Sequence, residues 1–184
     1  MAAQTFEVAS YKDAVLHLTN FPGVIERSSL VDLDTIYGLT DGTDATPLEA
    51  NDLLKWFRLP NLAKMLYARV DVEDLDSDAS PAITLDVIVS NGTTTKYFFD
   101  ESTIAQGGGF ADSRVPGTAG VKNAVDADTA VGFVIPPDGT QWYIAVKVGT
   151  AADVFQNDAI GLTVGYTMAL NNADYVRDVP TTNP

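Results

Sequence analysis

The chain contains no cysteine and only one histidine among its 184 residues. The first absence excludes disulfides, thiolate nucleophiles and cysteine-bound zinc or iron–sulfur sites. His17, in the segment VLHLT, is predicted to be an ordinary strand residue, because a lone imidazole lacks the partners of a zinc cluster or catalytic relay. The chain also lacks a GxSxG motif, a phosphate loop and a dinucleotide fingerprint. We therefore expect a protein without cofactors that is not an enzyme.

Long apolar runs and positive charge are also scarce. The longest apolar runs span a few residues, far fewer than the roughly 18 needed to cross a bilayer. Eleven Lys and Arg residues face 25 Asp and Glu residues, which gives a formal net charge of −14. Such a chain repels polyanions at long range, so we expect neither nucleic acid nor a membrane as partner.

What the sequence has in abundance is apolar residues at every second position, the period of a half-buried strand. The segments predicted as strands are 15–19, 30–39, 53–59, 64–72, 82–89, 95–100, 130–135, 141–149 and 159–170. A short helix over 46–54 and one helical turn over 100–106 complete the pattern. About nine short strands between Gly- and Pro-containing turns predict an all-β fold, an antiparallel β-sandwich with a jelly-roll-like arrangement and little helix.

The alternation also predicts which side chains face the core. In the predicted strands the inward sets are Leu66, Ala68, Val70 and Val72; Ile83, Leu85, Val87 and Val89; Trp142, Ile144, Val146 and Val148; and Ile160, Leu162, Val164, Tyr166, Met168 and Leu170. The last strand presents small residues on its other face, namely Gly161, Thr163, Gly165, Thr167 and Ala169. That face suits close packing against another subunit, and we predict a homotrimer, with a plain solvent face as the alternative.

An acidic segment, EDLDSDASP, separates two of the predicted strands. Asp74, Asp76 and Asp78 match the first three ligand positions of a calcium loop. The glycine that should follow is replaced by Ala79, and the glutamate at the twelfth position is replaced by Leu85. We therefore interpret the segment as a solvated connection between two paired strands, in which Asp and Ser bond their own backbone. A weak calcium site stays open as the alternative.

Basic residues concentrate in one window of the chain. Lys55, Arg58, Lys64 and Arg69 fall within fifteen residues that contain no acid. These are either ordinary solvated charges on two strands or a docking patch for an acidic partner. The glycine-rich run from Gln106 to Phe110 lacks the residues of a phosphate loop and predicts a flexible or closely packed loop.

Aromatic residues suggest a rival function. An exposed platform of Trp56, Tyr67, Tyr97 and Tyr143 would suit a carbohydrate-binding β-sandwich module. The favoured alternative places Trp56 and Trp142 in the core.

The two ends lack the strand pattern. We predict an N-terminal arm over 1–14, a β-sandwich domain over 15–170 and a C-terminal tail over 171–184, with both ends dispensable for folding. Arms of this kind can order on a neighbouring subunit. Their apolar residues are the expected partner contacts, namely Phe6, Val8, Tyr11, Tyr175 and Val179.

The central part of the chain carries a family resemblance. The run MLYARVDVEDLDSDASPAITLDVIVSNGTTTKYFFDESTIAQGGG, followed later by YIAVKVGTAADVFQNDAIGLTVGYT, resembles small virion proteins of tailed bacteriophages. The resemblance covers roughly residues 64–168. It implies a structural protein made in the host cytoplasm and located in the virion on the capsid surface. The implied partners are the major capsid protein and further copies of the chain, with a decoration (cement) role first and a neck or tail role second.

Overall fold

The computed structural model describes residues 5–7, 23–33, 48–115, 118, 120–122, 126–156 and 158–168. Its strands are β1 (Thr5–Glu7), β2 (Ile25–Asp32), β3 (Leu53–Leu59), β4 (Ala63–Val72), β5 (Thr84–Ser90), β6 (Thr95–Ser102), β7 (Gly109–Asp112), β8 (Trp142–Thr150) and β9 (Ala159–Met168). A 3-10 turn, η3 (Ile104–Gln106), lies between β6 and β7. Within these residues no helix is long and apolar enough to span a bilayer.

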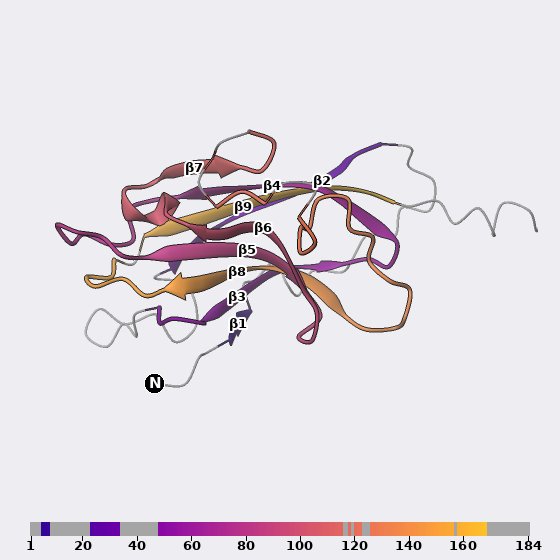
Figure 1. Ribbon diagram of the computed structural model, residues 1–184, viewed down its shortest axis with the longest axis horizontal. Coiled ribbons are helices and arrows are strands. Elements are labelled where there is room, and N and C mark those ends of the chain that lie inside the picture. The colour runs from indigo at the N-terminus through magenta and orange to yellow at the C-terminus, as the bar shows by residue number, and fades with distance from the viewer. Residues whose placement is uncertain are drawn as a thin grey trace, which may run out of the picture.

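The strands form two sheets that pack as two layers (Figure 1). Sheet A has the order β1-β3-β8-β5-β6, and sheet B has the order β2-β9-β4-β7. All pairings are antiparallel except that of β1 with β3, which is parallel. The predicted all-β sandwich is confirmed, and its jelly-roll order stays a prediction.

Alternating apolar residues from both sheets fill the space between the layers. The inward sets predicted for β5, β8 and β9 lie in one core cluster, with Met168 packed against it. Leu170 and Ala169 lie outside the described residues. In β4 the predicted inward face is right for Ala68, Val70 and Val72 but wrong for Leu66. A register shift between Met65 and Tyr67 reverses the alternation, so Met65 is buried instead.

Two predicted elements do not form in the described residues. Residues 130–135 are not a strand, because Gly132 adopts a φ of 81° and breaks the extended backbone. The segment nevertheless runs beside the start of β4, where the Ile135 N–H donates to the Ala63 carbonyl. In the described part of 46–54, the chain makes a turn at Asn51 instead of a helix, and β3 begins at Leu53.

Other elements are displaced or were not predicted. The strand expected at 30–39 runs from Ile25 to Asp32, and its part beyond Leu33 lies outside the described residues. The segment 15–19 with His17 lies outside them too. Strand β7 and strand β1 were not predicted, and β1 occupies three residues of the expected N-terminal arm. The one helical turn expected within 100–106 is η3.

Candidate interaction surface

The outward side of sheet B is the part of the described surface where polar and apolar groups are most closely organised. Strand register places its side chains in rows that cross all four strands. One row joins Leu30, Gly161, Asp71 and Phe110, and the next joins Ser28, Thr163, Arg69 and Asp112. A third row joins Glu26, Gly165 and Tyr67, and Arg114 completes it beyond the end of β7. We call these residues the sheet B face.

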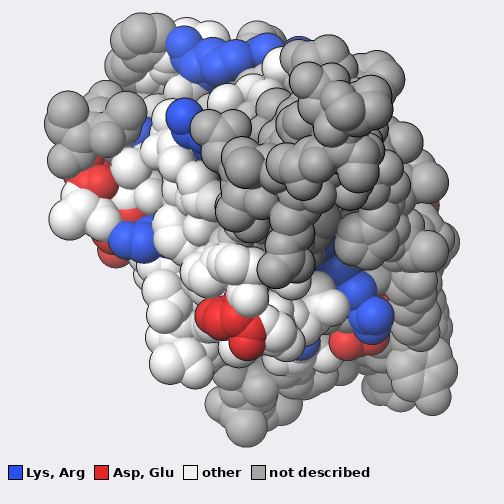
Figure 2. Space-filling model, turned by 90° about the vertical axis from the view of Figure 1, so that its right-hand side faces the viewer, with Lys and Arg blue, Asp and Glu red and all other residues white. Residues whose placement is uncertain are grey.

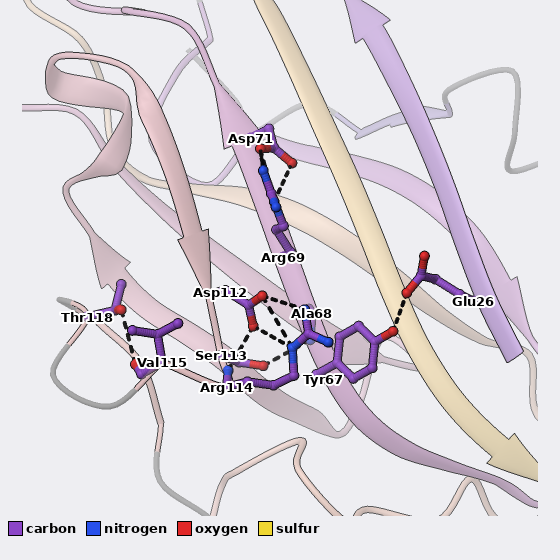
Figure 3. Close-up of polar contacts among 10 residues, drawn as sticks. All are labelled: Glu26, Tyr67, Ala68, Arg69, Asp71, Asp112, Ser113, Arg114, Val115 and Thr118. Atoms are coloured by element: carbon purple, nitrogen blue, oxygen red, sulfur yellow. Dashed lines mark hydrogen bonds and ion pairs between the residues drawn. The ribbon is translucent and has the colours of Figure 1, made fainter. Parts of the chain in front are cut away.

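Tyr67 crosses the centre of this face. Its hydroxyl donates a hydrogen bond to the Glu26 carboxylate on β2, two strands away (Figure 3). The ring lies over Gly165 of β9 so closely that a Cβ there would stand 2.3 Å from a ring carbon. Glycine at this position is therefore a condition for the bond between β4 and β2. The hydrogen bond to Glu26, and then burial, raises the pKa of Tyr67 above its ordinary value.

Arg114 holds the other side of the Tyr67 ring. Its guanidinium carbon lies 3.9 Å from the ring centroid, a cation–π contact, and its Nη2 lies 2.6 Å from Asp112 Oδ2. Hydrogen bonds from Arg114 lower the pKa of Asp112, although burial acts in the opposite direction. Ser113 links the end of β7 to β4 through two hydrogen bonds with Ala68. The Ser113 N–H donates to the Ala68 carbonyl, and the Ser113 hydroxyl oxygen accepts from the Ala68 N–H (Figure 3).

A second guanidinium on this face has a similar pair of neighbours. Arg69 donates to Asp71, with Nη2 2.5 Å from Oδ1, and its guanidinium carbon lies 4.5 Å from the Phe110 ring centroid. The three carboxylates of the face, Glu26, Asp71 and Asp112, are thus nearly balanced by two guanidinium groups. The face is close to neutral in a chain whose net charge is −14.

Two exposed apolar side chains lie at opposite edges of the same row. Leu30 on β2 is 72% exposed and Phe110 on β7 is 58% exposed. Between them lie Gly161, which has no side chain, and Asp71. The row therefore has a protruding apolar side chain at each end and smaller residues in the middle. The stripe of small residues predicted on β9 is not a flat open surface, since Tyr67 covers Gly165 and Leu30 contacts Gly161.

The four basic residues of the sequence window do not form one patch. Lys55 and Arg58 pair with Ala145 and Tyr143 on sheet A, whereas Lys64 and Arg69 lie on the opposite layer, on sheet B. Lys55 stands 4.8 Å from the Tyr143 ring centroid. Figure 2 shows basic side chains at several separate places on one end of the molecule, with acidic side chains between them. Binding of a partner by any of the four stays a prediction.

The acidic segment connects two strands that are not paired. β4 belongs to sheet B and β5 to sheet A, so the prediction of a turn between paired strands is wrong. The segment is not fully solvated either, because Leu75 and Asp76 are buried. Among the described residues, no three His, Cys, Asp or Glu side chains are placed to hold a metal ion.

Asp76 instead binds backbone amides. Its Oδ2 accepts from the N–H groups of Ala82 (2.8 Å), Ile83 (3.2 Å) and Asp153 (3.4 Å), and its Oδ1 accepts from those of Val154 (3.2 Å) and Asp78 (3.4 Å). Burial alone would raise the pKa of this carboxyl, but the backbone bonds from Ala82, Val154, Ile83 and Asp153 hold it below its ordinary value. The residue that looked like a calcium ligand ties the loop after β4 to the loop after β8.

The aromatic residues do not make the predicted platform. Trp56 is fully buried and Trp142 is 2% exposed, which confirms the alternative prediction that both lie in the core. Tyr143 is buried in a small cluster on the outer side of sheet A with Ile88 and Ala145, and Tyr97 is partly buried against it. Together with the covered ring of Tyr67, these positions leave no row of four exposed rings.

The glycine-rich run is closely packed at Gly108, whereas Gly107 has open space around it. Gly108 has a φ of 70°, and a Cβ there would lie 3.1 Å from the backbone nitrogen of Asp74. Next to it a pocket of about 220 Å³ is lined by Ser102, Thr103, Ile104, Gly107, Gly108, Ala111 and Thr118. It contains no charged side chain, and we assign it no role.

Of the nine predicted contact residues, the structure places five. Lys55, Arg58, Lys64 and Arg69 are described above, and the backbone of Phe6 lies in β1. Val8, Tyr11, Tyr175 and Val179 lie outside the described residues. Sequence reasoning missed Glu26, Leu30, Phe110, Asp112 and Arg114. The sequence offered one signal for this site, the triplet Asp112-Ser113-Arg114 shortly after Phe110. Only the order of the strands in sheet B shows that this triplet lies beside Tyr67.

No protein-family model matches the chain, and no curated protein sequence matches it. Among solved structures, a chain in "Capsid of Ralstonia phage GP4" is 21% identical with a TM-score of 0.61, and the match covers 90% of this chain and 99% of that one. A chain in "Cyanophage Pam1 capsid asymmetric unit" is 22% identical with a TM-score of 0.51, over 80% of this chain and 84% of that one. These likenesses show that the chain shares its fold with chains found in phage capsids.

Proposed function

We propose that the protein is a non-enzymatic structural component of a phage virion that binds the outer capsid surface and stabilises the shell. The observation that carries this proposal is the fold likeness to a chain of a phage capsid, which is matched over 99% of its length. The likeness therefore extends over an entire small chain and not over one domain of a larger protein. The family resemblance of residues 64–168 supports the same class of protein.

The proposed partner is the major capsid protein. A cement protein stabilises a shell by contacting several subunits at once, so that many weak contacts add to a strong attachment. The predicted arms and the basic residues of β3 and β4 are the proposed contacts. The strong negative charge would keep free copies apart and soluble before assembly in the host cytoplasm.

The direct test adds purified protein to capsids that lack it. Bound copies are counted after sedimentation, and DNA release is followed during heating. We expect saturable binding and release at a higher temperature than in bare capsids. A variant without residues 1–14 and a variant without 171–184 should each bind less. The second should keep its melting temperature, whereas the first should lose only about 2–4 °C, because it lacks the short edge strand β1. Absence of binding, with unchanged DNA release, would contradict the proposal.

A neck or tail component is the alternative within the same class. Copy number separates the two, because a cement protein covers the shell whereas neck and tail parts occur at one vertex. Quantitative protein staining of purified virions measures the molar ratio of this protein to the major capsid protein. A cement protein should give a ratio of about one or a simple fraction of one. A ratio below about one in ten would favour the neck or tail.

The carbohydrate-binding rival is less favoured, because Trp56 lies in the core and cannot stack on a sugar. A glycan array still measures it directly, and Trp56→Ala is not a useful variant there, since it would disturb folding. The homotrimer predicted from the sequence also stays a prediction, and the sedimentation measurements given below determine the mass of any assembly.

A further inference from the structure

The sheet B face has the arrangement that a surface needs to bind a second copy of itself. In a two-fold pair, residue i of one copy meets residue j of the other, and j of the first meets i of the second. A face can satisfy this condition only if its two halves complement each other. The three cross-strand rows of the sheet B face provide such halves.

Consider a two-fold axis that runs parallel to the strands, midway between β9 and β4. It reverses each row, so the β2 end of a row lies over the β7 end of the same row in the partner. In the first row, the exposed Leu30 then lies over the exposed Phe110 of the other copy. Because the axis is two-fold, the pair contains two such contacts between Leu30 of one copy and Phe110 of the other.

The other rows agree with the same axis. In the third row, Glu26 of one copy lies over Arg114 of the other, an acid over a guanidinium whose side chain is 54% exposed. In the second row, Ser28 lies over Asp112. The Ser28 hydroxyl is already bonded to Thr163, and the Asp112 side chain is 10% exposed and held by Arg114, so this row adds no new hydrogen bond. One axis thus joins opposite charges, and apolar with apolar.

The charge of the chain favours this face over others for self-contact. Two copies that each carry a net charge of −14 repel one another, and the repulsion is smallest where the touching surfaces are nearly neutral. On the sheet B face the carboxylates already have guanidinium or hydroxyl partners. Its ion pairs need not be broken on contact.

We propose that two copies of the chain pair through their sheet B faces about this two-fold axis. The strands β2, β9, β4 and β7 are 8, 10, 10 and 4 residues long, and at about 4.8 Å apart they offer roughly 500 Å² per copy, or about 1,000 Å² per pair. This area is near the lower limit for specific complexes, so the dissociation constant is expected in the micromolar range. The pairing does not depend on the proposed virion role.

Cross-linking of introduced cysteines tests the proposed arrangement of the two copies. Because the chain has no cysteine of its own, only the introduced residues can react. In the double variant Leu30→Cys/Phe110→Cys, the two sites of one chain are about 14 Å apart across three strand spacings. Two facing sheets lie about 10 Å apart, which is also beyond the Cα separation of about 7 Å that a disulfide allows, so the cysteines are joined with a short bismaleimide. Treatment at 50 µM protein should give a covalent dimer on a denaturing gel.

The controls are the two single variants and the pair Leu30→Cys/Val154→Cys. Val154 is 50% exposed but lies on the loop after β8, away from the face. We expect at least tenfold less covalent dimer from each control. Equal yields from the double variant and the controls would overturn the proposal.

Sedimentation velocity gives the second measurement. The full chain should shift from monomer to dimer between about 1 and 100 µM. Leu30→Asp should raise the dissociation constant at least tenfold, whereas Val154→Asp, with the same added charge, should leave it within twofold. A monomer at 100 µM, a trimer, or equal effects of the two substitutions would each contradict the two-fold pair.

Discussion

Asp76 is the residue whose chemistry differs most from its appearance in the sequence. Its carboxylate accepts five backbone hydrogen bonds, and the two from Asp153 and Val154 join the loop after β4 to the loop after β8. In Asp76→Asn, an NH2 group would replace one oxygen and face N–H donors in either orientation. We expect a loss of about 3 kcal/mol of unfolding free energy at pH 7, measured by urea denaturation. Asp74→Asn is the matched control, because within the described part of the chain Asp74 accepts one hydrogen bond, from the N–H of Asp76.

The same carboxyl contributes to pH dependence. Its pKa is lowered in the folded state, so its stabilising contribution is complete above the unfolded-state pKa of about 3.9 and is lost as the pH falls through the folded value. The stability difference between wild type and Asp76→Asn should therefore shrink below about pH 4. A difference that stays constant down to pH 2.5 would show that the charge of Asp76 does not contribute.

Gly120 illustrates a different requirement at the scale of one residue. Its φ is 79°, and a Cβ would lie 2.7 Å from the Asp100 carbonyl oxygen. Gly92 has a similar φ of 89° but open space around it. Gly92→Ala should cost about 1 kcal/mol from the left-handed backbone alone, and Gly120→Ala at least about 2 kcal/mol more. Thermal unfolding of the two variants separates the cost of the left-handed backbone from the cost of the steric contact. Equal losses of stability would show that the backbone near Gly120 shifts to make room for the methyl group.

At the scale of elements, the alternation of side chains predicted most of the sandwich. It located β3, β4, β5, β6, β8 and β9 because each carries apolar residues that pack in the core, although register shifts interrupt the alternation in β3 and β4. It missed β7 because glycines precede it and hide the pattern. It misplaced β2 because the half-buried positions there include two polar residues, Arg27 and Ser29, which break the apolar alternation, and the Arg27 guanidinium donates to the Arg58 carbonyl. Pairing between distant strands left no local trace in the sequence.

The candidate surface was predictable only in part for the same reason. Arg69 was recognised as a possible contact, and the small residues of β9 were recognised as unusual. The Tyr67–Glu26 bond joins residues 41 positions apart, and the row from Leu30 to Phe110 depends on β9 lying between β2 and β4. A sheet order of this kind follows from packing of the whole chain and not from periodicity.

The first strand allows a test at this scale. Thr5–Glu7 add a parallel edge to sheet A beside β3, and Thr5 and Glu7 are exposed. Deleting residues 1–7 should cost about 1 kcal/mol and lower the melting temperature by about 2–4 °C, with the far-ultraviolet spectrum unchanged. If the deletion variant does not fold, the first seven residues form part of the core, and the prediction of a dispensable N-terminal arm is wrong.

At the scale of the whole molecule, the net charge of −14 opposes compaction. Raising NaCl from 10 to 150 mM shortens the screening length from about 30 to about 8 Å, so we expect the melting temperature to rise. CaCl2 at equal ionic strength is the informative comparison. The same rise with both salts would indicate general screening, and a larger rise with calcium would indicate a specific site in the acidic segment. A temperature independent of salt would contradict the expected self-repulsion.

The order of the strands also determines when the protein can fold. β8 and β9, the last two strands of the described residues, lie in the interior of their sheets, between β3 and β5 and between β2 and β4. During synthesis, the early strands leave the ribosome long before these neighbours exist. Apart from the β5–β6 hairpin and the short β1–β3 and β4–β7 ladders, the ladders must wait for the final third of the polypeptide. Nascent chains therefore expose unpaired strand edges until translation is nearly complete, and folding is a late, non-local and comparatively slow event.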